Sequence, residues 1–406
     1  MKQYTRGETP VEEAIESIVR SLPCPEGTGT VSLLDGLNRV LACPVPAQVP
    51  QPPFTRSPLD GYALRAADIE GASRDNPVKL PVSQYLPAGS GLTAPLPQGM
   101  AARIMTGAPI PEGADCVIRQ EDTDQGEQEA EFYAYVEAGR NICYAGEDIA
   151  AGDLLIQPGT RLSFAHIGVL AGQGIDRIEV YDNPRVAVMS TGDELVAPGT
   201  PLTPGKIYDS NSKMLAARLM ELGIRPDLYT AGPDEPEVLA SRLDELLNRY
   251  SLVITTGGVS VGKRDFMPVV ADMVHTELLF HGIDAKPGSP VLAAVRGKSV
   301  LLALSGNPFA SVATFELLVL PALSRLSGET QWKAVRVKAK LKGNFKKSSN
   351  IRRFIRARIE GGYVSIPEKG HSSGGIGNLA GCNCMIDVPG GSGPVPDGDT
   401  VTVWLF

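Results

Sequence analysis

The residues best suited to chemistry follow apolar, strand-like runs of the chain. Glycine turns stand after four such runs: Thr191-Gly192-Asp193-Glu194, Gly232-Pro233-Asp234-Glu235, Thr256-Gly257-Gly258 and Ser305-Gly306-Asn307-Pro308. Carboxylates belong to the first two turns, and Asp265 follows the third. Glycine lets the backbone turn sharply and approach a ligand closely, and a following helix start offers free N–H groups that suit a phosphate. Mg²⁺ prefers one or two carboxylates together with phosphate oxygens and water. The pattern predicts a phosphate site with a divalent metal held by Glu194, Asp234 and Asp265.

The segment from residue 184 to residue 326 must position these turns. Strand-like runs alternate with helix-like ones: strands are expected at 185–190, 225–231, 252–256, 277–281, 291–295 and 300–304, and helices at 211–222, 236–249, 266–274 and 309–326. This rhythm predicts a doubly wound, mostly parallel sheet with helices on both faces. In such sheets a ligand binds outside the carboxyl ends of the strands. One carboxylate there is more often a helix cap than a ligand, so the prediction depends on three occurring together.

The flanking regions predict smaller β domains, which makes the whole chain a multidomain α/β protein. Short apolar runs separated by turns fill residues 64–144, and helices are expected at 163–172 and around 32–41. Val335, Val337, Ala339 and Leu341 alternate with basic residues, which predicts a strand with one buried face. A second strand is expected at 353–359, and the Gly/Pro-rich tail with its short strands indicates a small barrel or sandwich.

The composition excludes several classes of protein. The chain has 406 residues, 43% of them hydrophobic, and a net charge of −8 with a pI near 5.2, which argues against general nucleic-acid affinity. No apolar run approaches the roughly 20 residues of a membrane span, and the start lacks the apolar core of a signal peptide. Six scattered cysteines do not form a disulfide framework. We therefore expect a cytoplasmic protein without membrane or nucleic-acid partners.

Two local patterns allow other interpretations. Residues 331–359 contain eleven Lys/Arg and no acid, which fits a solvated face, attraction of an anionic ligand or, less well in an acidic chain, nucleic-acid binding with a steep salt dependence. Residues 257–263 match the P-loop pattern G-x-x-x-x-G-K, but Arg264 stands where a P-loop needs Ser or Thr to hold Mg²⁺. A P-loop NTPase is therefore disfavoured.

Taken together, the motifs resemble the MoeA family, the molybdopterin molybdenumtransferases related to the gephyrin E domain. The matching motifs are 57–63 (SPLDGYA), 103–109 (RIMTGAP), 146–149 (GEDI), 190–194 (STGDE), 256–262 (TGGVSVG), 286–288 (KPG) and 306–308 (GNP), in the family's order along nearly the whole chain. The resemblance implies an elongated discontinuous dimerisation domain (1–52 and 145–182), a small β domain (53–144), an α/β molybdopterin-nucleotide-binding domain (183–329) and a C-terminal β-barrel (330–406).

The resemblance also implies an activity and a site. The implied reaction inserts molybdate into the dithiolene of adenylylated molybdopterin and releases AMP, with Mg²⁺, in a homodimer whose site lies between subunits; other cofactor-biosynthesis proteins, such as molybdopterin adenylyltransferase, would be partners. The implied catalytic residues are Asp60, Thr106, Asp148, Glu194, Asp234 and Asp265, the first three facing the α/β domain of the partner subunit. The implied binding residues are Thr191, Gly192, Gly257, Gly258, Ser260, Lys286, Gly306, Asn307, Pro308, Arg352, Arg353, Arg356 and Ser373.

The chain also departs from the family's pattern. Ser289 replaces the second lysine of Lys-Pro-Gly-Lys-Pro, Gly282 stands where an upstream lysine is common, and Cys143-Tyr144-Ala145 replaces basic residues before Gly146. Each lost charge contact weakens anion binding by about 1.5–3 kcal/mol where the site is partly buried. Two alternatives therefore accompany the transferase: a diverged paralogue that handles tungstate, and a pterin-binding or scaffold protein of the same fold without turnover.

Overall fold

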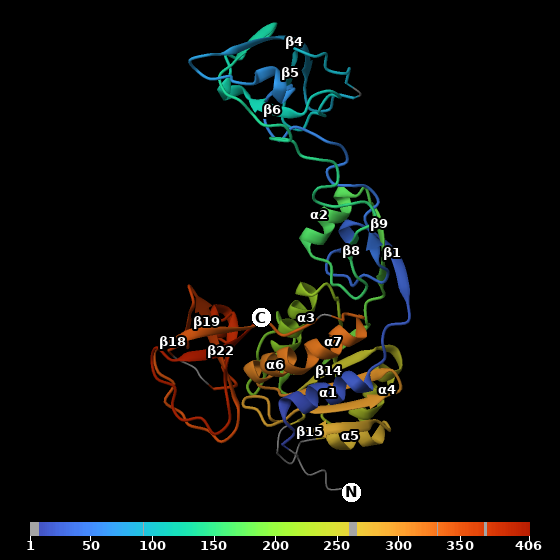
Figure 1. The fold of residues 1–406 in the computed structure, drawn as a ribbon. Helices are drawn as coiled ribbons and strands as arrows, with labels where there is room; N and C mark the ends of the chain where they lie inside the picture. The colour runs from blue at the N-terminus through green and yellow to red at the C-terminus, as the bar shows by residue number, and fades with distance from the viewer. Residues whose placement is uncertain (1–7, 92, 260–265, 331, 369–371) are drawn as a thin grey trace. The chain divides into compact units, whose positions relative to one another are not determined.

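The structure is a computed structural model and describes residues 8–91, 93–259, 266–330, 332–368 and 372–406. The chain divides into two compact units, which Figure 1 shows coloured along the sequence. The smaller unit is Pro44–Gln157 with Gly172–Gly174, and the larger is Met1–Cys43, Pro158–Ala171 and Ile175–Phe406. Ser260 and Asp265 lie outside the described residues, so the site predictions that fall on them stay predictions.

A six-stranded sheet forms the centre of the larger unit, in the order β13-β10-β14-β17-β16-β15. Neighbouring strands from β13 to β17 pair in parallel, whereas β16 runs antiparallel to both β17 and β15. The strands are β10 (Val186–Ser190), β13 (Asp227–Thr230), β14 (Leu252–Thr256), β15 (Glu277–His281), β16 (Leu292–Arg296) and β17 (Ser299–Leu304). Every residue of β10, β14 and β17 is buried, as expected for central strands covered on both faces.

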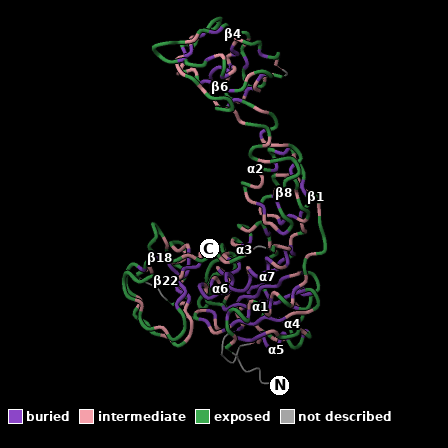
Figure 2. The backbone as a smooth tube through the Cα atoms, viewed as in Figure 1, coloured by how far each residue is buried: buried purple, intermediate pink, exposed green. Residues whose placement is uncertain are grey.

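Helices cover both faces of this sheet, so the doubly wound prediction is confirmed. One face packs against α1 (Val11–Ser21), α3 (Asn211–Glu221) and a long helix made of α6 (Pro308–Thr314), η4 (Phe315–Val319) and α7 (Leu320–Leu326). The other face packs against α4 (Pro236–Arg249) and α5 (Met267–Met273). Successive residues of a strand point into the hydrophobic cores on opposite faces of the sheet. Val188 and Leu302 pack in the core with α1 and α3, and Ala187 and Leu301 pack in the core with α4 and α5. In Figure 2 the buried residues concentrate between these layers.

The helix Pro308–Leu326 is long and apolar enough to cross a membrane, with a mean hydropathy of 1.5. However, 83% of that window is buried inside the protein. Phe315, Leu317 and Leu323 all belong to the core beneath the sheet. Packing therefore accounts for the apolar sequence of this helix.

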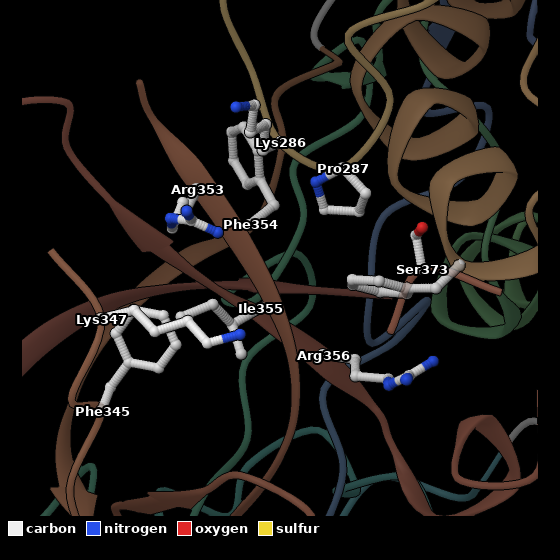
Figure 3. Close-up of a pocket in the computed structure, with 10 residues that line it drawn as sticks. Lys286, Pro287, Phe345, Lys347, Arg353, Phe354, Ile355, Arg356 and Ser373 are labelled. Carbon is white, nitrogen blue, oxygen red and sulfur yellow. The ribbon is translucent and has the colours of Figure 1, made fainter. Parts of the chain in front are cut away.

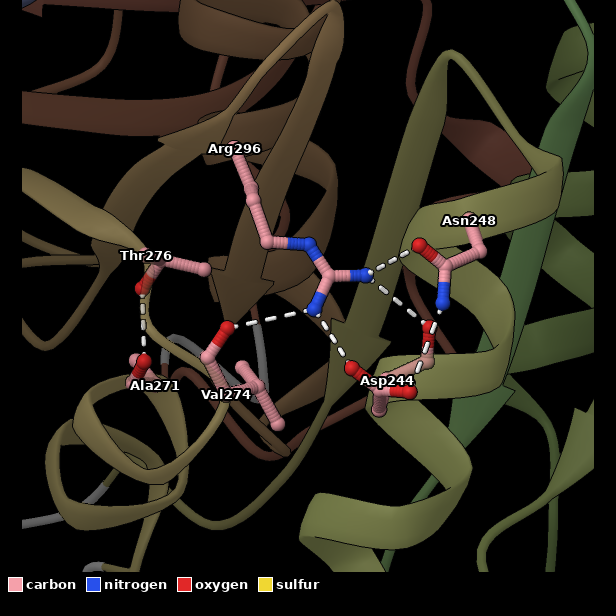
Figure 4. A network of polar contacts seen from close by, with 6 residues as sticks. All are labelled: Asp244, Asn248, Ala271, Val274, Thr276 and Arg296. Carbon is pink, nitrogen blue, oxygen red and sulfur yellow. Dashed lines mark hydrogen bonds and ion pairs between the residues drawn. The ribbon is translucent and has the colours of Figure 1, made fainter.

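Arg296 at the end of β16 ties together the two helices of the other face (Figure 4). Its guanidinium donates to the Asp244 carboxylate at 2.6 Å, to the Asn248 side-chain oxygen at 3.0 Å and to the Val274 carbonyl at 3.1 Å. Asp244 and Asn248 lie on α4, and Val274 follows α5. One side chain thus binds two side chains of α4 and the carbonyl of Val274 at the end of α5, where backbone carbonyls lack helical partners.

Beside the sheet, the larger unit contains a two-stranded sheet of β1 (Thr28–Ser32) and β9 (Arg177–Tyr181), the short 3₁₀ turn η1 (Leu34–Gly36) and most of α2 (Phe164–Gly172). The helix expected at 163–172 is confirmed as α2. The prediction of a helix around residues 32–41 is wrong. The backbone there pairs with distant residues instead: Asn38 N–H donates to the Leu162 carbonyl, and Leu41 N–H donates to the Thr160 carbonyl.

The C-terminal strands close into a barrel in the order β18-β20-β19-β21-β22. These are β18 (Arg336–Lys342), β19 (Arg353–Glu360), β20 (Tyr363–Ser365), β21 (Cys384–Val388) and β22 (Thr400–Leu405), with the turn η5 (Leu379–Gly381) before β21. Ala339 and Leu341 point into the barrel core while Lys338, Lys340 and Lys342 are exposed, as the alternation predicts. Val335 precedes β18 and is 58% exposed, so the predicted buried face does not extend to it. Phe354 and Trp404 pack edge to face at 5.8 Å and join the core of the sheet, so barrel and sheet share one apolar cluster.

The smaller unit contains a five-stranded sheet in the order β6-β3-β5-β4-β7. Its strands are β3 (Gly61–Leu64), β4 (Val78–Leu86), β5 (Ala101–Ile104), β6 (Cys116–Arg119) and β7 (Glu129–Phe132), with turns η2 (Ala66–Ile69) and η3 (Gln120–Asp122), and β2 (Val45–Pro46) pairs with β8 (Leu154–Ile156). Tyr62 and Phe132, both fully buried, meet edge to face at 5.4 Å. The predicted fold class, a doubly wound α/β domain with small β domains, is confirmed, and all six cysteines are free.

Candidate active site

The glycine turns after β10, β14 and β17 meet around one pocket at the carboxyl edge of the parallel strands. The pocket has a volume of about 340 Å³. Of the predicted site residues, Thr191, Glu194, Gly257, Gly306, Asn307 and Pro308 line it. The strands bring these residues together because all three run parallel and end at the same edge. We name this hollow the strand-end pocket.

Gly257 is held tightly against the turn that follows β10. Its φ is +99°, and a Cβ atom there would lie 2.7 Å from both the carbonyl oxygen and the hydroxyl of Thr191. Thr191 N–H in turn donates to the Thr256 carbonyl at 3.0 Å, and Gly257 N–H donates to the Leu304 carbonyl at 3.1 Å. Only glycine adopts this backbone and this close approach without strain. The three strand ends therefore form one fixed cradle.

The neighbouring glycines, Gly192 and Gly258, adjoin residues that line the pocket but do not line it themselves. Gly192, with a φ of +137°, turns the chain so that a Cβ atom there would meet the Glu194 carboxylate within 2.9 Å. Gly258 has a φ of +69° and lies against Met267 at the start of α5. These contacts explain why the sequence concentrates glycine at this edge.

The turn before α6 forms the far wall of the pocket. Asn307 is the residue at the helix start, and its N–H donates to the Ser305 hydroxyl at 3.3 Å. Phe309 N–H donates to the Ser373 carbonyl at 3.1 Å, which fastens the loop after residue 372 onto this helix end. Gly374 and Ile376 of that loop also line the pocket. The positive end of a long helix dipole thus faces the space where an anion would lie.

Asn211, at the start of α3, lines the same pocket and was not predicted from the sequence. It is 9% exposed, and its amide nitrogen donates to the Gly306 carbonyl at 2.7 Å. A carbonyl can only accept, so the atom facing it is the NH₂ group and the other is the oxygen. That oxygen is buried and has no hydrogen-bond partner among the described residues. The run Asp209-Ser210-Asn211 before a helix was the available signal, but it reads equally as a cap.

Beside Asn211 stands a small flap formed by β11 (Leu195–Val196) and β12 (Ile207–Tyr208), which pair in parallel. Leu195, Ile207 and Tyr208 from this flap line the pocket opposite the glycine turns. Tyr208 is 42% exposed, and its hydroxyl donates to the Thr200 carbonyl at 2.9 Å. The strand-end pocket therefore has a polar backbone side suited to an anion and an apolar, aromatic side suited to a ring.

The carboxylates at this edge are only partly gathered. Glu194 is exposed and lines the pocket, as does Asp209, whose carboxylate already accepts from the N–H and hydroxyl of Ser212. Asp234 lies after β13, where its N–H donates to the Asp193 carboxylate at 3.2 Å. Within the described residues no group of three or more His, Cys, Asp or Glu could hold a metal ion. Glu194 fits Mg²⁺ that takes its remaining ligands from phosphate oxygens and water.

A second pocket, of about 260 Å³, lies where the loop after β15 meets the barrel (Figure 3). Lys286, Arg353, Arg356 and Ser373 line it, four of the predicted anion-binding residues, together with Lys347, which was not predicted. Pro287, Phe309, Phe345, Phe354 and Ile355 supply apolar walls. We name this hollow the cationic pocket.

The three arginines of β19 and the preceding loop differ in their surroundings. Arg356 is 2% exposed, and burial lowers its pKa; its guanidinium donates to the carbonyls of Ser372, at 2.8 Å, and Gly375. Arg356 thus anchors the loop that carries Ser373. Arg352 does not line either pocket, because Asp387 at 2.7 Å and Glu12 at 2.7 Å occupy its guanidinium. That ion pair joins the barrel to α1.

Asp60, Thr106 and Asp148 belong to the smaller unit. The Asp60 carboxylate accepts from the N–H and the hydroxyl of Thr106, both at 2.7 Å, and these hydrogen bonds lower the pKa of Asp60. Asp148 is exposed, with its N–H donating to the Gln51 carbonyl at 3.0 Å. Asp60 is therefore a preorganised, ionised carboxylate with Thr106 as its partner.

The fold and the pockets define a class: a multidomain protein with a doubly wound domain. A pocket opens at the strand ends of that domain, and the barrel helps to form a second, cationic pocket. Comparisons identify the family. The "MoeA N-terminal region (domain I and II)" matches residues 9–174, the "Probable molybdopterin binding domain" matches residues 187–325 and the "MoeA C-terminal region (domain IV)" matches residues 338–406. The chain belongs to the MoeA family.

Individual relatives agree over the full length. A molybdopterin molybdenumtransferase of Staphylococcus aureus is 36% identical, covering 98% of this chain and 96% of the relative, and one of Staphylococcus epidermidis is 35% identical. The crystal structure of a molybdopterin biosynthesis moeA protein from Pyrococcus horikoshii OT3 is 30% identical, with a TM-score of 0.84 over 98% of this chain and 100% of that one.

The buried oxygen of Asn211 leads to a prediction. We expect Asn211→Ala to weaken binding of AMP, used as a probe of the strand-end pocket, by about tenfold, because the variant loses both the link to Gly306 and an acceptor for a ligand N–H. Isothermal titration calorimetry measures this. Asn248→Ala, on α4 and not among the residues that line the pocket, is the control, and equal affinities in the two variants would contradict the prediction.

Proposed function

We propose that this protein is a molybdopterin molybdenumtransferase that inserts molybdate into the dithiolene of adenylylated molybdopterin and releases AMP. The observation that carries the proposal is the strand-end pocket, where three glycine turns and the start of a long helix meet Glu194. A phosphoanhydride with a heterocycle on one side suits a pocket that has glycine turns and a helix start on one side and apolar, aromatic residues on the other. Relatives named molybdopterin molybdenumtransferase match nearly the full chain, which supports the same reaction.

The residues have separate tasks in this proposal. Thr191, Gly192, Gly257, Gly258 and Ser260 cradle the phosphates, and Gly306, Asn307 and Pro308 bring the helix end against them. Glu194, with Asp234 and Asp265, would hold Mg²⁺, which would polarise the phosphoanhydride when bound. Asp60, which is ionised and hydrogen-bonded to Thr106, and Asp148 belong to the smaller unit and are proposed to be catalytic residues.

The cationic pocket is proposed to take the oxyanion. Lys286 offers an ammonium group and Ser373 a hydroxyl toward it, and a tetrahedral anion is matched by such donors. Arg356 holds the loop of Ser373 in place through two carbonyls. We also propose that the protein acts as a cytoplasmic homodimer that receives its pterin from an adenylylating enzyme.

The test is AMP release. Purified protein is mixed with adenylylated molybdopterin and Mg²⁺, with molybdate, with tungstate or with neither, and the product is tested for reconstitution of an apo-molybdoenzyme. We expect molybdate-dependent AMP release with active cofactor. A preference for tungstate would favour the paralogue. Tight pterin binding with no AMP released under any anion would contradict the catalytic proposal and favour a binding role on the same fold.

A further inference from the structure

Two of the carboxylates proposed to hold Mg²⁺ stand on different turns of the chain. Glu194 belongs to the turn after β10, and Asp234 belongs to the turn after β13. These two strands are neighbours that pair in parallel, so their turns lie side by side at the carboxyl edge of the sheet. A metal ion that both carboxylates contact requires the two turns to be fixed against each other.

The side chain of Asp193 provides such a link. Its carboxylate accepts a hydrogen bond from the Asp234 backbone N–H at 3.2 Å. Where the paired strands end, Ala231 N–H donates to the Ser190 carbonyl at 3.0 Å, and the Asp193 bond joins the turns beyond that point. Because Asp193 directly precedes Glu194, one hydrogen bond connects the segments that carry the two proposed metal ligands.

The flap of β11 and β12 holds the backbone on the other side of this link. The Lys206 ammonium group donates to the Asp193 carbonyl, and Ile207 N–H donates to the Glu194 carbonyl at 2.8 Å. Within the turn itself, Leu195 N–H donates to the Gly192 carbonyl at 3.0 Å. The peptide groups around Asp193 are therefore fixed, although the residue is exposed, and its carboxylate is directed at Asp234 from a rigid base.

We propose that Asp193 is a positioning residue of the metal site, which holds the turn of Asp234 in place relative to Glu194. The inference rests on the proposed function for the presence of Mg²⁺ and adds a residue that orients its ligands. Groups that hydrogen-bond to the segments carrying metal ligands typically change metal affinity by roughly 10–100-fold. The bond to the Asp234 N–H requires an oxygen acceptor and no charge, so an amide at position 193 should preserve it.

The experiment uses ADP as a probe, because ADP combines a pyrophosphate with a nucleoside. Isothermal titration calorimetry on the full chain measures its dissociation constant in excess Mg²⁺ and in EDTA, and the ratio of the two values reports the contribution of the metal. Asp193→Ala should reduce this ratio about tenfold. Its dissociation constant in EDTA should stay within about twofold of the unaltered protein's value, because Asp193 does not line the strand-end pocket. Asp193→Asn should keep the ratio within about threefold.

Glu235→Ala is the matched control. Glu235 is an exposed carboxylate beside Asp234, its side chain makes no capping hydrogen bond to α4, and it does not line the strand-end pocket. This variant removes the same negative charge from the same turn and leaves the Asp193 link intact. Its ratio should stay within about twofold of the unaltered protein's value. Thermal unfolding of each variant shows that the chain is folded at the temperature of the titration.

Three results would overturn the inference. Equal ratios in Asp193→Ala and Glu235→Ala would make Asp193 an ordinary turn residue. Equal weakening of ADP binding by Asp193→Ala in Mg²⁺ and in EDTA would mean that the residue supports the fold and not the metal site. A loss in Asp193→Asn as large as that in Asp193→Ala would make the carboxylate a metal ligand and not a positioning group.

AMP release, measured separately, distinguishes this inference from the proposed function. A Mg²⁺ effect on ADP binding that depends on Asp193, without AMP release from adenylylated molybdopterin, would support the inference and reject the transferase. ADP binding by the unaltered protein that is the same in Mg²⁺ and in EDTA would overturn the inference, and AMP release with molybdate would still support the transferase.

Discussion

Gly257→Ala is expected to lower the rate of AMP release at least about 100-fold, since displacement of reacting groups by about 1 Å already has an effect of that size. The new methyl group would lie 2.7 Å from the carbonyl oxygen and the hydroxyl of Thr191, so one strand-end turn must move away from the other. The φ of +99° adds strain of about 1–3 kcal/mol for any residue with a Cβ atom. Both the clash and the backbone strain would distort the turns proposed to hold the phosphates.

The matched control is Gly199→Ala. Gly199 has a φ of +92° but nothing within 4 Å of where its Cβ atom would stand, and it does not line the strand-end pocket. This variant incurs similar backbone strain without the clash, and it should keep AMP release within about threefold. Thermal unfolding of both variants separates lost stability from lost geometry. A folded Gly257→Ala variant as active as Gly199→Ala would show that the cradle is not part of the site.

Local pattern predicts the doubly wound domain well because each of its elements is signalled by neighbours in sequence. The run Leu252–Thr256 is apolar and β-branched, and it forms a strand buried along its whole length. The turns are also predictable from local sequence. Gly257 and Gly306 each mark a turn that follows a strand, so both turns must lie at the carboxyl edge of the sheet. Parallel strand order then brings the turns together without further information.

The remaining site residues depend on contacts that no local pattern encodes. Asn211 reads as a helix start, and its bond to Gly306 spans 95 residues. Arg352 and Arg353 are adjacent arginines that the sequence does not distinguish. In the structure Arg352 binds Asp387 and Glu12, whereas Arg353 lines a pocket. The sequence predicts a helix around residues 32–41, but backbone N–H groups there donate to the carbonyls of Leu162 and Thr160 instead. Tertiary pairing decides each case.

Arg218→Met is expected to lower the free energy of unfolding by about 3 kcal/mol near neutral pH, because it leaves a buried carboxylate without its cation. Arg218 on α3 donates to both oxygens of Glu316, at 2.8 and 3.3 Å, and Glu316 is 4% exposed on the long helix. Urea denaturation measures the change. Glu221→Gln, which removes the exposed second partner of Arg218, should change the value by less than about 1 kcal/mol.

The stability lost in Arg218→Met should depend on pH. Burial raises the pKa of Glu316, and Arg218 opposes that rise; without Arg218 the folded-state pKa rises further above its unfolded value. A carboxyl group whose pKa is higher in the folded state than in the unfolded state contributes stability when the pH is below the unfolded-state pKa. This stability is lost as the pH rises through the folded-state pKa. The deficit of Arg218→Met should therefore shrink as the pH falls from neutral toward the ordinary carboxyl range. The double variant Arg218→Met/Glu316→Gln removes the charge altogether and should regain most of the loss at every pH. A deficit that is independent of pH and persists in the double variant would mean that packing of the Arg218 stem, and not the buried charge, holds α3 against the long helix.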